Sequence, residues 1–375
     1  MFSSSHSSPP ARRRALALLG AAASSSLLLV ACSTGPASVT SPVATPSSVP
    51  SSYAPTTVTL LTHDSFALTK SLLSEFTARS GITVKIVTGG DAGEVVNKAA
   101  LTAGNPEGDV LFGVDNTLLS RALRAGVFDP YVSPAAASVP TELQTSTSAT
   151  VTPIDYGDVC INTDDAWFAA RGIPKPTTLA DLAAPRYRDL LVVENAATSS
   201  PGLAFLLATI ARFGEGGYED YWRSLRANGV KVVNGWTEAY EGEFSAGGKG
   251  SRPLVVSYAS SPPAEIVYAA EPKPTRPSTS VMTDGCFRQV EYAGVLRGTT
   301  HPDAARAVVD WLLSPEVQAD VPLSMFVFPA RTGTVLPAVF TDFAARPADP
   351  LTIDPTVIDA QRDAWVEAWD QVTLR

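Results

Sequence analysis

VTLLTHDSFALTKSLLSEFTARSGITVKIV (58–87) is the stretch that decides the fold class. It starts with an apolar run at 58–62 and ends with an alternating run at 82–87, and both patterns are typical of strands. Between them, residues 70–80 carry apolar side chains at helical spacing. A helical stretch near 93–103 and a strand at 109–113 follow. This alternation predicts an α/β protein with a largely parallel sheet.

Ligands of such sheets bind beyond the carboxyl ends of the strands, so the loops there are the first candidate sites. Three loops qualify, namely 62–65, 114–116 and 155–157. In the second half, the strand 190–193 precedes a helix over 202–213. Ser199 and Ser200 stand at the start of that helix, where they serve either as simple caps or as ligand contacts.

The stretch NGWTEAY (234–240) and the later LVVSYASSPP (254–263) follow two further predicted strands, 230–233 and 253–257. They bring Trp236, Tyr240 and Tyr258 together with Glu238. Aromatic faces and a carboxylate both attract a flat organic cation. The alternative interpretation is that these rings are ordinary core residues.

The first residues are predicted to be a targeting segment. Three arginines, 12–14, precede an apolar run over 15–30, and LVAC (29–32) resembles a bacterial lipobox. Residues 1–31 are therefore predicted as a lipoprotein signal peptide and Cys32 as the lipidated residue that anchors an exported protein to the cell membrane. The region up to residue 56 is rich in Ser, Thr, Pro and Ala, which is typical of a flexible linker.

Net charge and cysteine content indicate which partners and which disulfide to expect. The formal net charge is −9, which argues against nucleic acid as a partner and permits a cationic ligand. Cys160 and Cys286 remain beyond the lipobox. In an oxidising compartment they are expected to form one disulfide, with two buried free thiols as the alternative.

Signals of catalysis or metal binding are weak in this sequence. His63 and His301 are far apart, and neither HExxH nor CxxC spacing occurs. Serine-hydrolase, NTPase and dinucleotide motifs do not occur either. We therefore expect neither a catalytic residue nor a metal or cofactor, and a binding protein rather than an enzyme.

The C-terminal region reads as helical. An amphipathic segment spans 304–313, and Ser314 before Pro315 is typical of the start of another helix. Trp365 and Trp369 share one face of a terminal helix, where docking onto the core is the favoured role.

Eight segments in order resemble the thiamine-binding proteins of bacterial ABC importers, within the type II periplasmic-binding-protein superfamily. The generic WLLSPEVQ is shared by many solute-binding proteins, whereas GWTEAY followed by SYASSP is more specific to the thiamine group. The segments are THDSFA (62–67), GVDNTLL (113–119), PIDYGDV (153–159), TSSPGLAFLL (198–207), NGWTEAY (234–240), VSYASSPP (256–263), WLLSPEVQ (311–318) and AQRDAWVEAW (360–369).

The resemblance implies two α/β lobes, each a mostly parallel sheet flanked by helices, joined by hinge strands and closing on a ligand. Lobe 1 is expected to comprise 57–155 with about 282–340, and lobe 2 to comprise 156–281. The segment 341–375 is expected to pack on the lobes as helix. The two cysteines would then lie near the lobe junction.

The resemblance also implies which residues contact the ligand. Trp236 and Tyr258 would contact the ligand rings, with Tyr240 close by. The SSPG turn would hold a hydroxyethyl or phosphate end, and Glu238 or Asp64 would offset the thiazolium charge. The complete expected set is Asp64, Ser65, Asp115, Tyr156, Ser199, Ser200, Gly202, Trp236, Glu238, Tyr240, Tyr258 and Phe326.

The sequence departs from the family pattern at three places. His63 replaces an aromatic residue before Asp64, the tryptophan expected soon after is absent, and Phe326 stands where a second tryptophan is expected. The implied function is capture of thiamine or a thiamine phosphate, by a monomer, for an ABC permease in the membrane. A polyamine or iron(III) ligand, an exported lipid-anchored hydrolase, and a sensor or scaffold role are the alternatives.

Overall fold

The computed structural model describes residues 53–145, 149–247 and 249–375, which belong to one compact unit. The predicted signal peptide, Cys32 and most of the predicted linker lie outside the described residues. The last linker residues are already part of the fold, because the backbone N–H of Tyr53 donates to Ser80 O at 2.7 Å.

One half of this unit, called here the first lobe, is built around a parallel three-stranded arrangement in the order β2-β1-β3. Strand β3, which lies between β1 and β8, is buried at every position because helices cover both faces of the sheet. The strands are β1 (Thr56–Thr62), β2 (Ile82–Thr88) and β3 (Val110–Asp115). The helices are α1 (Lys70–Ser80), α2 (Ala92–Leu101), α3 (Leu119–Ala125), α8 (Pro302–Leu312) and α9 (Pro315–Ser324).

The other half, the second lobe, repeats the arrangement with the parallel order β7-β5-β6. Helix α5 is buried along most of its length against this sheet. The strands are β5 (Leu191–Glu194), β6 (Lys231–Val233) and β7 (Leu254–Tyr258). The helices are α4 (Asp165–Arg171), α5 (Ser200–Phe213), α6 (Tyr218–Ala227), α7 (Pro263–Val267) and the π-helical segment Glu238–Glu243.

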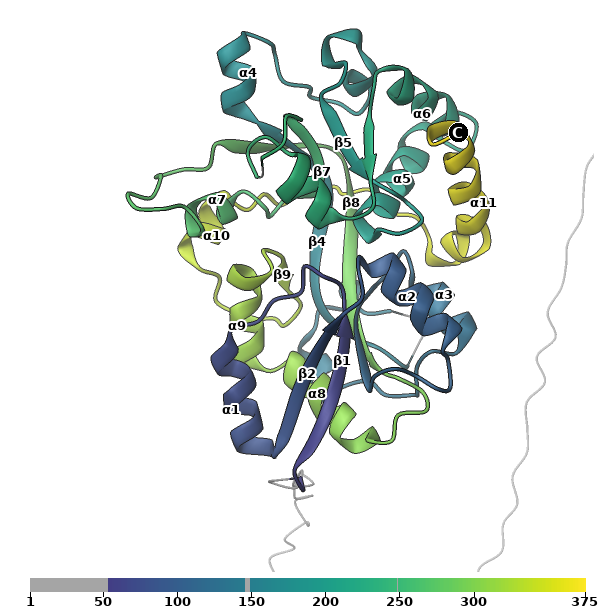
Figure 1. Ribbon diagram of the computed structural model, residues 1–375, viewed down its shortest axis with the longest axis vertical. Helices are drawn as coiled ribbons and strands as arrows, with labels where there is room; N and C mark the ends of the chain where they lie inside the picture. Colours follow the sequence, from purple (N-terminus) through teal and green to yellow (C-terminus); the bar gives the residue numbers. More distant parts are fainter. Residues whose placement is uncertain (1–52, 146–148, 248) are drawn as a thin grey trace, which may run out of the picture. The chain divides into compact units, whose positions relative to one another are not determined.

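Two long strands join the lobes, β4 (Thr152–Asp164) and β8 (Thr279–Val295). Figure 1 shows them running through the middle of the unit from one lobe to the other. They make the sheet continuous, in the order β2-β1-β3-β8-β4-β7-β5-β6, and each pairs antiparallel with its neighbours. The prediction of a mostly parallel sheet in each lobe, with hinge strands joining the lobes, is confirmed. The antiparallel pairs lie at the junction, because the chain crosses between the lobes in opposite directions along β4 and β8.

The predicted lobe boundaries, near 155/156 and 281/282, fall inside these two strands and stay a prediction. The remaining elements are short, and one of them, β9, pairs antiparallel with β4. They are β9 (Phe328–Pro329), α10 (Ala338–Phe343) and the 3₁₀ turns Pro134–Ser138, Thr141–Leu143, Ala180–Ala183 and Pro185–Tyr187.

The C-terminal helix α11 (Pro355–Thr373) contacts α6 of the second lobe and α3 of the first. Trp365 and Trp369 are buried, and the Trp369 ring meets Trp222 edge-to-face at 5.5 Å. The docking role predicted for the two tryptophans is confirmed. None of the helices in the described ranges has the length and apolar character needed to cross a membrane.

Candidate functional site

A cleft of about 780 Å³ lies between the two lobes of the folded unit. This volume is within the ~300–1,000 Å³ typical of small-molecule sites. Its lining is contributed by the loop after β1, by the loop after β6 with the π-helical segment, and by the end of β7 with α7 and the loop after it. The end of α9, the loop after it and one residue of β8 complete the lining. The lining residues are His63–Ala67, Trp236, Thr237, Tyr240, Glu241, Ala246, Gly247, Tyr258, Ser261, Ala264, Glu265, Tyr268, Ala269, Pro274, Arg276, Ser278, Glu291 and Ser324–Val327.

Aromatic rings form the second-lobe wall of the cleft. Trp236 and Tyr240 stack with ring centroids 5.0 Å apart and an angle of 12° between their planes. The indole N–H of Trp236 donates to Ser257 Oγ at 2.9 Å, which fixes the orientation of the ring. Tyr258 lies so close to β4 that a Cβ on Gly157 would be 2.7 Å from its ring. These side chains come from the ends of β6 and β7, as the position of ligands in α/β sheets requires.

The loop after β1 forms the facing wall. His63 Nδ1 is 2.8 Å from Ser65 Oγ, and the exposed Asp64 follows the histidine directly. Gly113, with φ of +94°, makes room for His63, because a Cβ there would lie 2.4 Å from the imidazole. The histidine that replaces the expected aromatic residue is thus built into the wall of the cleft.

A buried group of ionisable residues lies under this wall. His63 Nε2 is 3.5 Å from Glu291, which pairs across the sheet with Asp155. Burial favours neutral imidazole, but the Glu291, Asp91 and Asp64 charges outweigh it and raise the pKa of His63. Burial opposes ionisation of Glu291 as well, and the charge of His63 overcomes it and lowers the pKa of Glu291.

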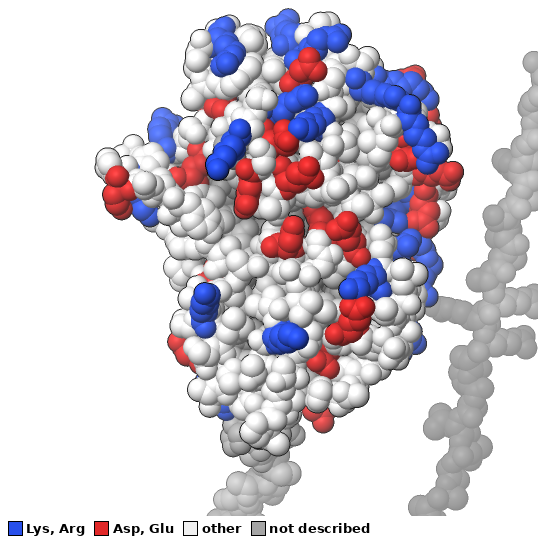
Figure 2. Space-filling model, in the orientation of Figure 1, with Lys and Arg blue, Asp and Glu red and all other residues white. Residues whose placement is uncertain are grey.

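A further buried carboxyl group, that of Asp155, lies beside Glu291. Burial first, and then the charge of Glu291, raise the pKa of Asp155 well above its usual value, which favours its neutral form. On the face drawn in Figure 2, Asp and Glu side chains are also grouped across the middle of the unit.

Phe326 completes the first-lobe side of the cleft. It adopts φ of +56°, which a non-glycine residue rarely adopts and which marks strain that the surrounding fold must hold. Its ring meets Tyr268 at 5.4 Å in an edge-on arrangement. The residue that stands where a second tryptophan is expected therefore still presents a ring to the cleft.

Asp115 and Ser200, both in the predicted ligand set, lie outside the cleft lining and contact each other across the lobes. Ser200 Oγ donates to Asp115 Oδ2, and Gln289 Nε2 donates to the same oxygen at 2.8 Å. Asp115 Oδ1 accepts from the N–H groups of Thr117 and Leu118, both at 3.0 Å. Burial raises the pKa of Asp115 to about 6 despite these hydrogen bonds.

Asp91 makes a second contact of this kind, and the sequence analysis missed it. Its Oδ1 accepts from Ala92 N at 2.6 Å, which caps α2, and from Ser200 N at 3.3 Å, while Oδ2 accepts from Trp236 N at 2.9 Å. Nearby, a Cβ on Gly93 would lie 2.4 Å from the carbonyl oxygen of Thr198, so only glycine allows this approach. We call Asp91, Asp115, Ser200 and Gln289 the interlobe clasp.

The other predicted residues outside the cleft lining have local roles. Ser199 caps α5 through Gly202, whose N–H donates to Ser199 Oγ at 3.3 Å. Tyr156 stacks on Phe328 at 5.3 Å, on the strand face opposite Asp155. Glu238 accepts from Asn234 N at 3.0 Å and so closes its own turn. The cleft lining thus contains Asp64, Ser65, Trp236, Tyr240, Tyr258 and Phe326 of the predicted set.

Several lining residues carried no recognisable signal in the sequence. Glu241 lies one residue past the quoted NGWTEAY segment, and it lines the cleft where Glu238 does not. Glu265, Tyr268 and Arg276 lie on α7 and the loop that follows, a region without strand or motif signals. Glu291 sits inside a strand, where an acidic residue gives no indication of a site.

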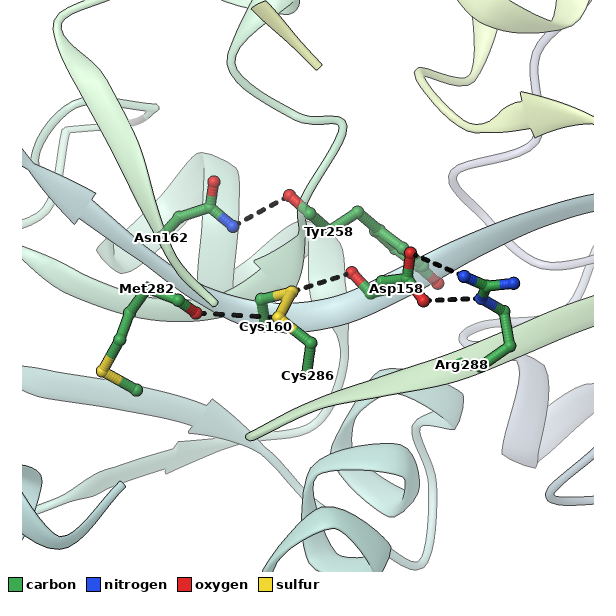
Figure 3. Close-up of a disulfide and its surroundings, with 7 residues drawn as sticks. All are labelled: Asp158, Cys160, Asn162, Tyr258, Met282, Cys286 and Arg288. Carbon is green, nitrogen blue, oxygen red and sulfur yellow. Dashed lines mark hydrogen bonds and ion pairs between the residues drawn. A yellow bond between two sulfur atoms is a disulfide. The ribbon is translucent and has the colours of Figure 1, made fainter. Parts of the chain in front are cut away.

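A disulfide joins β4 to β8 through Cys160 and Cys286, close to the lobe junction where the resemblance put both cysteines. In Figure 3 it lies beside the ion pair between Asp158 and Arg288, whose atoms are 2.6 Å apart. Within the described ranges, no group of three or more His, Cys, Asp or Glu side chains is arranged to hold a metal ion.

A family model for bacterial extracellular solute-binding proteins matches residues 105–346. The chain belongs to this family. As a solute-binding protein, it is similar to a thiamine-binding periplasmic protein of Salmonella typhimurium, with 29% identity over 86% of this chain and 95% of the relative. This confirms the prediction of an extracellular or periplasmic solute-binding protein rather than an enzyme.

Solved structures agree on the fold of this solute-binding protein. A periplasmic thiamin binding protein matches with a TM-score of 0.75 and 27% identity, covering 85% of this chain and 96% of the other. A ferric binding protein from Campylobacter jejuni matches with a TM-score of 0.68 at 17% identity, covering 84% of this chain and 99% of the other. At this identity the match supports the fold and not the ligand. The predicted periplasmic-binding-protein fold is confirmed.

Proposed function

We propose that this solute-binding protein captures thiamine between its lobes and delivers it to an ABC permease in the membrane. The observation that carries the proposal is the stacked pair Trp236–Tyr240, which faces an acidic cleft. Thiamine combines two flat rings with one positive charge, and aromatic faces and carboxylates attract both features. Relatives that are named for thiamine binding along nearly their whole length support the same choice.

In this proposal the ligand rings contact Trp236 and Tyr258, with Tyr240 supporting the indole from behind. Asp64 and Glu241 offset the thiazolium charge, since both line the cleft and neither side chain makes a hydrogen bond or ion pair with the described part of the chain. Ser65 supplies a hydroxyl, and Phe326 closes the first-lobe side.

Titration of the purified full-length chain with thiamine, followed by calorimetry, tests the proposal. We expect saturable binding with one ligand per chain. A polyamine such as spermidine is the comparison ligand, because it carries positive charge without rings. Binding of spermidine but not thiamine, or of neither, would overturn the assignment and leave the fold unaffected.

We further propose that the protein is a monomer anchored to the membrane by a lipid on Cys32. The LVAC sequence before the linker supports the anchor. Cells that express the wild-type chain or Cys32→Ala are separated into membrane and soluble fractions. The wild-type chain is expected in the membrane fraction and the variant outside it, and equal distribution of the two would contradict the anchor. Light scattering after chromatography of the variant measures whether it is a monomer.

A further inference from the structure

Among the described residues that line the cleft, His63 is the only histidine. Histidine is the side chain that ordinarily changes its charge between about pH 5 and pH 8. The ring is buried, its Nδ1 lies 2.8 Å from the Ser65 hydroxyl, and it occupies the space that Gly113 leaves free. An imidazole held in this way cannot turn away from a ligand, so the charge it gains on protonation stays beside the ligand.

The ionisable groups that face His63 are carboxyl groups. Its Nε2 lies 3.5 Å from Glu291 of β8 and makes no hydrogen bond within the described part of the chain. Burial alone would lower the pKa of His63, but the charges of Glu291, of Asp91 before α2 and of Asp64 raise it above about 6.5. Asp155 of β4, beside Glu291, stays neutral because burial, and then the charge of Glu291, raise its pKa. Before a ligand binds, the imidazole is therefore largely protonated at about pH 6.

The remaining neighbours of His63 are uncharged rings. The rings of Phe112 and Phe66 have their centroids 5.6 and 6.5 Å from that of the imidazole. Tyr258 stays neutral, because burial, and then the charge of Glu291, raise its pKa well above the usual value. The proton on His63 is thus the positive charge that balances Glu291.

Exposure decides which lining charges a ligand meets at full strength. Asp64, Glu241 and the guanidinium of Arg276 are all exposed, so water and salt screen the two carboxylates and the cation alike. His63 and Glu291 are only 8% and 7% exposed, and charges in such a place are screened much less. The protonated pair has no net charge, whereas loss of the proton leaves the negative charge of Glu291 at the cleft.

From this geometry we propose that His63 couples capture to pH, because a cation that enters the cleft takes the place of the proton that balances Glu291. The proton leaves the imidazole for the solvent, and the positive charge of the ligand then offsets Glu291. The proposal rests on the proposed function, since thiamine carries the charge that competes with the proton. Binding and protonation oppose one another, so the affinity for a cation falls as the pH falls through the pKa of His63.

Calorimetric titration of the full-length chain with thiamine at about pH 8 and about pH 6 tests the coupling. We expect binding about fivefold weaker at the lower pH, because like charges close together in a partly buried site repel each other. Titrations at neutral pH in phosphate and in Tris measure proton release, since the two buffers take up a proton with different heats. We expect each thiamine that binds to release part of a proton.

The variant His63→Gln separates the imidazole from other titrating groups, because glutamine is polar but does not titrate. Buried carboxyl groups such as Asp115 remain in this variant. We expect equal thiamine affinities at the two pH values and no proton release. The matched control is His301→Gln, which removes an exposed imidazole that lies 3.3 Å from Asp109, outside the cleft. This control is expected to keep the wild-type ratio of affinities.

An affinity that does not change with pH, or a pH dependence that survives in His63→Gln, would overturn the coupling and leave the proposed function standing. Absence of thiamine binding at both pH values would overturn the proposed function as well. If His63→Gln does not fold, NMR of the imidazole signals in the wild-type chain gives the same test. Thiamine is expected to lower the pKa of His63, with His6 and His301 as internal references, and an unchanged pKa of His63 would contradict the coupling.

Discussion

The cleft and the interlobe clasp both contain carboxylates, yet the hydrogen bonds of these carboxylates differ. In the clasp, both oxygens of Asp91 and of Asp115 accept hydrogen bonds from the protein. In the cleft, the side chains of Asp64 and Glu241 and the hydroxyl of Tyr240 make no hydrogen bond or ion pair with the described ranges. Satisfied polar groups hold a fold together, whereas unsatisfied ones are available to a ligand. Hydrogen bonding thus distinguishes the carboxylates of the clasp from those of the cleft.

Removing the clasp carboxylate at Asp91 is expected to have the largest effect. Asp91→Ala loses a helix cap and leaves the N–H groups of Ser200 and Trp236 without their acceptor. We expect the free energy of unfolding to fall by about 3 kcal/mol, as measured by urea denaturation. Small-angle scattering is expected to detect more open lobes.

The matched control for this variant is Asp354→Ala, which removes the cap of α11 alone. Its expected loss is smaller, about 1 kcal/mol, without opening. If the two variants lose equal stability and scatter alike, Asp91 acts only as a cap and the clasp has no role in closure.

On the cleft side, Trp236→Ala is expected to weaken thiamine binding by about 2 kcal/mol, or roughly 30-fold, because a stacking face is lost. Trp167→Ala removes a half-buried indole from α4, outside the cleft lining, and serves as control. Calorimetry measures both affinities. Unchanged affinity in the Trp236 variant would mean that the stacked pair is merely structural.

The smallest effect is a pH dependence that belongs to the clasp. The pKa of Asp115 is raised to about 6 in the folded state, so protonation of this carboxyl group stabilises the fold. This contribution to the free energy of unfolding is lost as the pH rises through about 6. Between about pH 5 and pH 6 this loss is roughly 1 kcal/mol. Asp115→Asn is expected to remove that part of the slope.

Urea denaturation of wild type and Asp115→Asn at both pH values measures the slope. The exposed Asp349, changed to Asn, is the control and is expected to leave the wild-type slope in place. A wild-type slope in Asp115→Asn would show that other buried carboxyl groups, such as Glu194, account for the dependence.

The fold could be predicted wherever the local pattern was regular. The helix over 70–80 has the same bounds in the structure, since its apolar spacing is clear. The long strands β4 and β8 went unrecognised because they carry residues that disfavour strands, including Pro153, Asp158 and Gly285. Their strand form depends on pairing with distant segments, which a single-sequence pattern does not report.

The candidate site was predictable in part for the same reason. Trp236 and Tyr258 follow apolar strands, and that position, together with the family resemblance, indicated a cleft. Asp91 gives no such indication, because an aspartate before a helix is typical of an ordinary cap. Its second role appears only when the lobes meet, as does the absence of Ser200 from the cleft lining.

The bond between Cys160 and Cys286 gives the second lobe a distinct topology. The two cysteines are 126 positions apart, and the segment between them contains β5, β6 and β7 with their helices. In the oxidised protein this lobe is therefore a closed covalent ring attached to the rest of the chain at two neighbouring strands. A single cut by a protease in any of its loops opens the ring without releasing a fragment. Such a nicked protein separates into pieces only after a reductant is added.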